Sequence, residues 1–122
     1  MGRDDAVVES GDEGDAPPGA VMEDGFDEFI HVPARLSIVA LLAPAEWVEF
    51  RFLRETIGTS DSALSKQITA LENAGYVTVR KERSGTTRRT LVRLSDHGRA
   101  AFAAHAAALE RIVRSARTES ST

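Results

Sequence analysis

The sequence has no cysteine, few aromatic residues and no long apolar run. The lack of cysteine excludes disulfides, thiolate metal sites and a cysteine nucleophile. No apolar stretch approaches the roughly 20 residues that a membrane-spanning helix needs, and the N-terminus is acidic where a signal peptide would be basic. The three histidines, His31, His97 and His105, lie far apart in the chain. We therefore expect a soluble cytoplasmic protein that has no membrane contact, no metal site and no cofactor.

The net charge of −4 is unevenly distributed along the 122 residues. Residues 1–30 hold ten acidic residues and one basic residue, whereas residues 31–122 hold nine acidic and fourteen basic residues. The chain therefore consists of an acidic leader and a basic remainder.

The opening segment "MGRDDAVVESGDEGDAPPGAVMEDG" is rich in Gly, Asp and Pro and has no aromatic residue. Such a segment buries too little apolar surface to offset its loss of conformational entropy. We predict a disordered acidic tail over residues 1–24, one folded domain over 25–117 and a disordered C-terminus over 118–122. The tail is either a solvated leader or an intramolecular competitor of the ligand that the basic part of the chain binds.

Three helices are predicted in the first half of the domain. Apolar spacing places the first over residues 33–43, with Pro33 in its first turn. The second contains Phe50, Leu53 and Ile57, follows a brief extended piece at Trp47–Val48 and ends at Gly58. The third begins at Ser60 or Asp61 and continues to Gly75, with an inward stripe of Leu64, Ile68 and Leu71.

A hairpin and a long helix complete the domain. The segments "YVTVRKE" and "TLVRLS" alternate apolar with polar residues and flank the turn "RSGTTRR". The alanine-rich helix then begins at Ser95 or Asp96. The predicted fold class is mainly α with a small β-hairpin (α+β), a winged helix-turn-helix in the order helix, helix, helix, strand, strand, helix.

The outward face of the third helix carries small polar groups. With the apolar stripe facing inward, Ser62, Lys66, Thr69 and Asn73 point outward and Ser65 lies at the flank. These groups can reach base edges or phosphates in a major groove. Taken alone, the same residues would also suit an ordinary solvated surface.

Positive charge is concentrated in the hairpin. Residues 78–93 contain five arginines and one lysine against the single acidic residue Glu82. Such charge binds phosphates, with an affinity that falls as salt rises. A charged hairpin can instead be a solubilised sheet edge, but its place directly after a helix-turn-helix favours a DNA-binding wing.

Three segments carry a resemblance to a known family. These are "LENAGYVTVRKERSGTTRR", "LVRLSDHGRAAF" and "FDEFIHVPARLSIVALL". They resemble winged-helix bacterial transcriptional regulators of the MarR/ArsR-like group over about residues 26–113. The resemblance implies a homodimeric regulator, most often a repressor, that occupies a pseudo-palindromic operator in double-stranded DNA. The sequence identifies no small-molecule effector.

The resemblance also implies which residues contact DNA. On the recognition helix they are Ser62, Ser65, Lys66, Gln67 and Thr69, and on the wing they are Arg83, Thr86, Thr87, Arg88 and Arg89. Related regulators that sense metals use cysteines and clustered histidines, which this chain lacks.

The last helix is longer than so small a core requires. We expect its apolar side chains to form a dimer interface, chiefly through Phe102, Leu109, Ile112 and Val113. His105 is expected in the core or at the dimer contact, and His31 as a structural hydrogen-bonding residue. Trp47 and Phe50 are expected to be core residues rather than the lining of an effector pocket.

Two other function classes compete with the DNA-binding regulator. A winged helix can serve as a protein-protein adaptor, with the basic wing bound to an acidic partner and no sequence-specific DNA binding. An enzyme is disfavoured, because the chain has no glycine-rich phosphate loop, metal-ligand spacing or nucleophile-base pair that can be recognised.

Overall fold

The computed structural model describes residues 24–120 as four helices and a three-stranded antiparallel sheet. The predicted acidic tail lies outside the described residues except for Asp24, and so do residues 121 and 122. The helices are α1 (Pro33–Leu42), α2 (Phe50–Ile57), α3 (Asp61–Asn73) and α4 (Asp96–Ser120), and the strands are β2 (Val48–Glu49), β3 (Val77–Ser84) and β4 (Thr87–Leu94). The predicted α+β winged-helix class is confirmed, including the short extra strand beside Trp47.

Local signals in the sequence explain where the helices begin and end. Pro33 occupies the first turn of α1, where its missing N–H costs nothing. Gly58 ends α2 in the left-handed conformation, with φ of 77°. The Oγ atom of Ser60 accepts a hydrogen bond from the Ala63 N–H at 3.1 Å, and Ser95 Oγ accepts one from the Gly98 N–H at 2.9 Å. Serine N-caps therefore start both α3 and α4.

The strands of the hairpin are longer than predicted. Pairing of β3 with β4 runs from Val77 opposite Leu94 to Ser84 opposite Thr87, so only residues 85 and 86 connect them. The predicted turn over residues 83–89 is wrong for most of its length. The reason is that Gly85, with φ of 63°, permits a two-residue connection, and backbone pairing then continues through residues that are too polar to indicate a strand.

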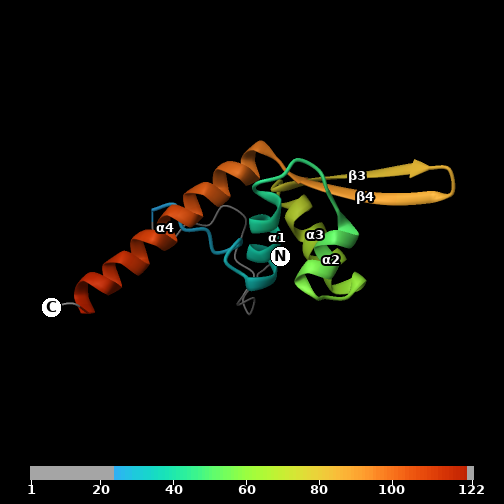
Figure 1. The fold of residues 1–122 in the computed structure, drawn as a ribbon. Helices are drawn as coiled ribbons and strands as arrows, with labels where there is room; N and C mark the ends of the chain where they lie inside the picture. The colour runs from blue at the N-terminus through green and yellow to red at the C-terminus, as the bar shows by residue number, and fades with distance from the viewer. Residues whose placement is uncertain (1–23, 121–122) are drawn as a thin grey trace, which may run out of the picture.

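The helices α1, α2 and α3 cover one face of the sheet, and the distal half of the hairpin projects beyond them (Figure 1). The core contains apolar residues from all of these elements and from the segment before α1: Phe29, Ile30, Ile38, Val39, Leu42, Leu53, Leu64, Ile68, Leu71, Tyr76, Val77, Val92 and Leu94. The predicted inward stripe of α3 is buried as expected. This packing fixes α3 and the base of the hairpin relative to each other.

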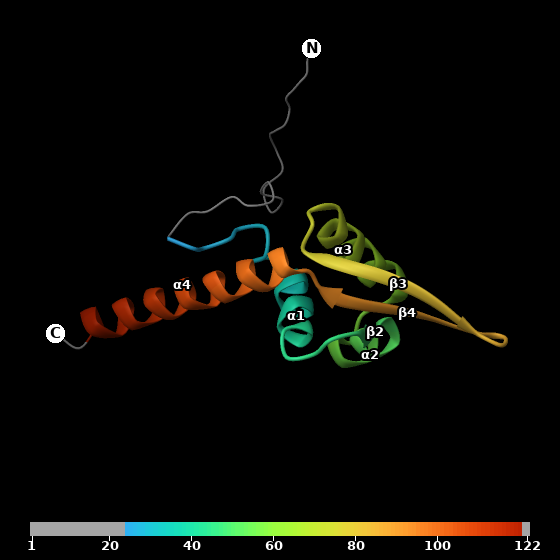
Figure 2. The same ribbon diagram turned by 90° about the horizontal axis from the view of Figure 1, so that it is seen from above.

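The last helix, α4, extends away from the rest of the domain on the side opposite the hairpin (Figures 1 and 2). It runs to Ser120, so the predicted domain end at residue 117 falls inside it. Its first turn lies directly on the backbone of Tyr76, the residue before β3, because a Cβ atom added at Gly98 would be 2.0 Å from the Tyr76 carbonyl oxygen. Glycine thus permits a backbone contact that no larger residue allows here.

Candidate nucleic-acid interface

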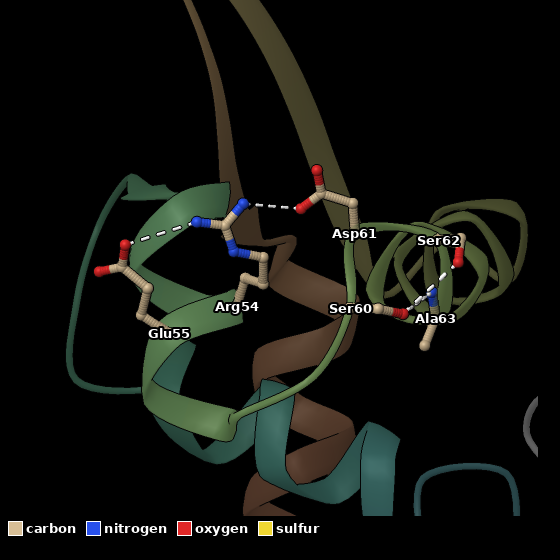
Figure 3. Close-up of polar contacts among 6 residues, drawn as sticks. All are labelled: Arg54, Glu55, Ser60, Asp61, Ser62 and Ala63. Carbon is tan, nitrogen blue, oxygen red and sulfur yellow. Dashed lines mark hydrogen bonds and ion pairs between the residues drawn. The ribbon is translucent and has the colours of Figure 1, made fainter.

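The turn between α2 and α3 is held by an arginine. Arg54 donates from Nη1 to Asp61 Oδ1 at 2.8 Å and from Nη2 to Glu55 Oε2 at 3.4 Å (Figure 3). The hydrogen bond to Asp61 is the main cause that raises the pKa of Arg54. Together with the Ser60 cap, this contact fixes the start of α3 against the end of α2.

The outward face of α3 is polar and open. Ser62, Ser65, Lys66 and Thr69 are all exposed, while Leu64 and Ile68 between them are buried. The helix therefore presents three hydroxyl groups and one ammonium group along one side, which suits contacts with base edges and phosphates.

Gln67 is set apart from these residues. It is half-buried, and its Oε1 atom accepts a hydrogen bond from Arg35 Nε at 3.0 Å. Arg35 is 7% exposed, donates to the Phe29 carbonyl oxygen at 3.1 Å and stacks on the Phe29 ring. Gln67 thus connects α3 to the segment before α1, a contact that its place on the helix gave no reason to expect.

The register of the hairpin divides its cations between two faces. Side chains alternate between the two faces along each strand, and residues that pair directly point to the same face. The pairs on one face are Arg80 with Leu91, Glu82 with Arg89, and Thr78 with Arg93. We call the side chains of Arg80, Glu82, Arg89 and Arg93 the outer face of the wing. The intervening side chains continue the sheet face that carries Val77 and Val92 of the core, and we call Lys81, Arg83, Arg88 and Thr90 the inner face of the wing.

On the outer face, each arginine has a carboxylate partner. Arg89 donates to Glu49 Oε2 at 2.9 Å and to Glu82 Oε1 at 3.0 Å. The hydrogen bond to Glu82, followed by that to Glu49, raises the pKa of Arg89. Arg80 lies 3.0 Å from Glu82, and Arg93 lies 3.6 Å from Glu46.

On the inner face, the cations are exposed and unpaired. Within residues 24–120, Lys81, Arg83 and Arg88 form no ion pair. An open cavity of about 390 Å³ separates the start of α2 from β4 and is lined in part by Arg51 and Arg88. Thr86 and Thr87 are exposed at the tip. The predicted wing residues are therefore divided: Arg83 and Arg88 are available for phosphate, and Arg89 belongs to an ion-paired network.

Sequence reasoning missed the role of Trp47. Its ring is 4.3 Å from the Arg80 guanidinium carbon and 5.5 Å from that of Arg93. It is half-buried beside the wing, whereas Phe50 packs against the core as expected. A two-residue hairpin turn would have predicted that Arg80 and Arg93 share one face of the hairpin, but Trp47 reaches them through the pairing of β2 with β4, which has no local signal in the sequence.

An apolar groove lies between α1 and α4, away from the wing. It has a volume of about 400 Å³ and is lined in part by Leu36, Phe102, Leu109 and Val113. Ile112 and Val113 are 41% and 51% exposed, respectively. The four predicted dimer residues thus form one stripe along α4, with Phe102 and Leu109 half-buried and the other two open.

The junction between α4 and the segment before α1 contains buried polar side chains. His105 is fully buried, and its Nδ1 atom accepts a hydrogen bond from the Asp27 N–H at 2.9 Å. Its Nε2 atom therefore carries the proton and donates to His31 Nδ1 at 3.1 Å. The Asp27 carboxylate accepts from the Tyr76 hydroxyl at 2.6 Å and from the Phe29 and Ile30 N–H groups. Both histidines have the structural roles expected of them.

Residues 24–120 contain neither a metal-binding cluster nor a membrane-spanning helix. No group of three or more histidine, cysteine or acidic side chains there is arranged to hold a metal ion. No helix in the same range combines the length and the apolar character needed to cross a membrane.

Residues 34–113 match the family model described as winged helix DNA-binding domain. An uncharacterised protein, MJ0432 of Methanocaldococcus jannaschii, is 32% identical over 68 residues, which are 56% of this chain and 74% of that protein. The solved transcriptional regulator homologue of Pyrococcus horikoshii OT3 is similar in fold, with a TM-score of 0.67 and 23% identity over 70% of this chain and 85% of that one. The homodimeric winged helix-turn-helix DNA-binding domain Mb0332 of Mycobacterium bovis gives a TM-score of 0.52 and 26% identity over 74% of this chain and 75% of that one.

Proposed function

Since this chain belongs to the winged helix DNA-binding domain family, we propose that it is a sequence-specific transcriptional regulator that represses by occupying an operator. In this proposal, α3 enters the major groove of double-stranded DNA and the wing lies on the flanking backbone or minor groove. Regulation of this kind requires no bond-making chemistry.

The observation that carries the proposal is that two sets of exposed polar groups lie on the same side of the domain. The exposed hydroxyls and Lys66 lie on α3, which packs on the same face of the sheet that Arg83 and Arg88 continue beyond the core. A DNA duplex beside α3 would therefore meet these two arginines. Hydroxyl groups suit base edges, and unpaired arginines suit phosphates.

A homodimer is the second part of the proposal. The groove between α1 and α4, with Ile112 and Val113 open to solvent, offers an apolar surface that a second copy would bury. The Mycobacterium bovis domain of similar fold is homodimeric. A two-fold dimer would present two copies of α3 to a pseudo-palindromic operator.

The function is tested by selecting bound fragments from a random pool of double-stranded DNA and sequencing them. We expect enrichment of a pseudo-palindrome whose half-sites are about one helical turn, or roughly 10 base pairs, apart. A pool that stays random after repeated selection would reject the regulator and leave the protein-protein adaptor as the better account.

The dimer is tested separately by light scattering at micromolar concentration. Wild-type protein should have twice the mass of one chain, and Val113→Asp should shift it to a monomer because a carboxylate would enter the apolar contact. The matched control is Ala107→Asp, an exposed position of α4 outside the groove lining. A monomeric wild type, or equal effects of the two variants, would rule out this interface.

A further inference from the structure

Two adjacent arginines of β4 have opposite surroundings. Arg88 lies on the inner face of the wing and forms no ion pair within residues 24–120. Arg89 lies on the outer face and donates to both Glu49 and Glu82. A cation that already has two carboxylates releases fewer counterions when it approaches a phosphate. Charge alone therefore overstates how much of the wing binds DNA.

The outer-face contacts connect the projecting hairpin to its base. Glu82 lies 3.0 Å from both Arg80 and Arg89, and Arg89 in turn reaches Glu49 on β2. These contacts run along the wing and across all three strands of the sheet. Each exposed pair is weak when isolated, but a chain of shared partners restrains several side chains together.

Trp47 anchors the same face nearer the core. It directly precedes β2, whose Val48 pairs with Val92, and its ring stacks with Arg80 and Arg93. Leu91, which pairs with Arg80, is only 6% exposed although it lies outside the main core cluster. Side chains on the outer face therefore cover Leu91 and form a small second layer at the base of the wing.

A two-stranded ribbon that projects from a domain twists and bends easily unless something supports it. We propose that Trp47, Glu49 and Glu82 are positioning residues, which hold Arg80, Arg89 and Arg93 away from DNA and fix the direction in which the inner-face cations project. The inference rests on the proposed DNA-binding function for its purpose, but the support of the wing can be measured without DNA.

The first experiment measures the wing in free protein. Backbone ¹⁵N relaxation and residual dipolar couplings of the full chain should show residues 83–88 aligned with the core in wild type. The variant Trp47→Leu should increase their mobility and change their mean direction, and Trp47→Phe should restore most of the alignment, because an aromatic face suffices for the stacking. The control Phe52→Leu removes an aromatic ring that is 52% exposed on α2 and should change nothing in the wing. A wing unaffected by Trp47→Leu would overturn the inference, whether or not the protein binds DNA.

The second experiment compares the two adjacent arginines on the selected operator. Arg88→Ala should lower the slope of log affinity against log salt by about 1, whereas Arg89→Ala should weaken binding about threefold with the slope nearly unchanged. Trp47→Leu should weaken binding about fivefold, also without a change in slope, because it loosens the wing but removes no phosphate contact. Equal losses of slope for the two arginine variants would contradict the division into faces. If wild-type protein selects no DNA, the proposed function fails, and the relaxation measurement still decides whether the wing is held.

Discussion

Polar side chains have opposite surroundings at the α4 junction and on the proposed DNA-binding surface, which consists of the exposed face of α3 and the inner face of the wing. At the junction, Asp27, Tyr76 and His105 are buried, and their hydrogen-bonding atoms have partners. On the proposed DNA-binding surface, Lys66 and Arg88 are exposed and form no ion pair within residues 24–120. A buried polar group without its partner destabilises a fold, whereas an exposed unpaired group contributes little to stability and can bind a ligand. Substitutions at the two regions should therefore separate stability from binding.

The largest effect is expected at Asp27. Asp27→Ala would remove the carboxylate that accepts from the Tyr76 hydroxyl and from the Phe29 and Ile30 N–H groups. We expect a loss of about 3 kcal/mol in the free energy of unfolding, measured by urea denaturation. The control Glu72→Ala removes an exposed carboxylate from α3 and should stay within about 0.5 kcal/mol of wild type. Similar losses for the two variants would show that the buried polar groups contribute no more to stability than exposed ones.

The combined variant Lys66→Ala and Arg88→Ala tests the other region. We expect operator affinity to fall roughly 30-fold, or about 2 kcal/mol, and the salt slope to fall by about 2. The free energy of unfolding should change by less than about 0.5 kcal/mol, because both side chains are exposed. Fluorescence anisotropy at several salt concentrations measures the slope. Arg111→Ala, which removes one cation from α4, is the control that should keep the wild-type slope, and an unchanged slope in the double variant would remove these residues from the interface.

The pH dependence of stability should originate at the junction. Burial, reinforced by the nearby His31, lowers the pKa of His105, and a proton on Nδ1 would also break the bond from the Asp27 N–H. The unfolded chain, with a histidine pKa of about 6.5, therefore takes up this proton before the folded chain does. Stability should be constant above that pH and fall below it by up to about 1.4 kcal/mol per pH unit.

Urea titrations between pH 7.5 and 5.5 measure this loss. The variant His105→Gln should flatten the dependence, and His97→Gln, at an exposed position, should keep it. A pH profile that is the same in all three proteins would show that the buried histidine does not couple protonation to folding.

Features of the fold that depend on a few neighbouring residues could be predicted from the sequence, and features that depend on distant residues could not. The predicted helix starts, at Ser60 or Asp61 and at Ser95 or Asp96, and the predicted end at Gly58 are correct because caps depend on one or two residues, and the serine is the cap in both cases. The strand lengths were wrong because residues 83–89 are polar and their pairing depends on the opposite strand. Periodicity on α3 separated buried from exposed positions correctly, but it could not show that Arg35, 32 positions earlier, would bind Gln67.

The sequence predicts the positive charge of the candidate site but not how its cations are arranged. The count of arginines between residues 78 and 93 indicated phosphate binding, yet it treated Arg88 and Arg89 alike. Their difference arises from two carboxylates: Glu82, on the paired strand β3, and Glu49, which β2 brings beside β4 from about 40 residues earlier in the chain. Long-range strand pairing of this kind leaves no local trace in a single sequence.

The smallest predicted effect concerns two serines at the start of α3, Ser60 and Ser62, of which the first stabilises the fold and the second is exposed. Ser60 Oγ accepts from the Ala63 N–H and caps the helix, whereas Ser62 Oγ is exposed and has only a long contact, 3.4 Å, with Ser60 Oγ (Figure 3). Ser60→Ala should cost about 1 kcal/mol of stability, the usual value for a lost N-cap. Ser62→Ala should leave stability within about 0.5 kcal/mol of wild type and weaken operator binding roughly fivefold, since it would remove one of the proposed hydrogen bonds to DNA. Urea denaturation and anisotropy on both variants measure the four values. If Ser62→Ala lost stability and kept affinity, the exposed face of α3 would belong to the fold and the DNA contact would have to lie elsewhere.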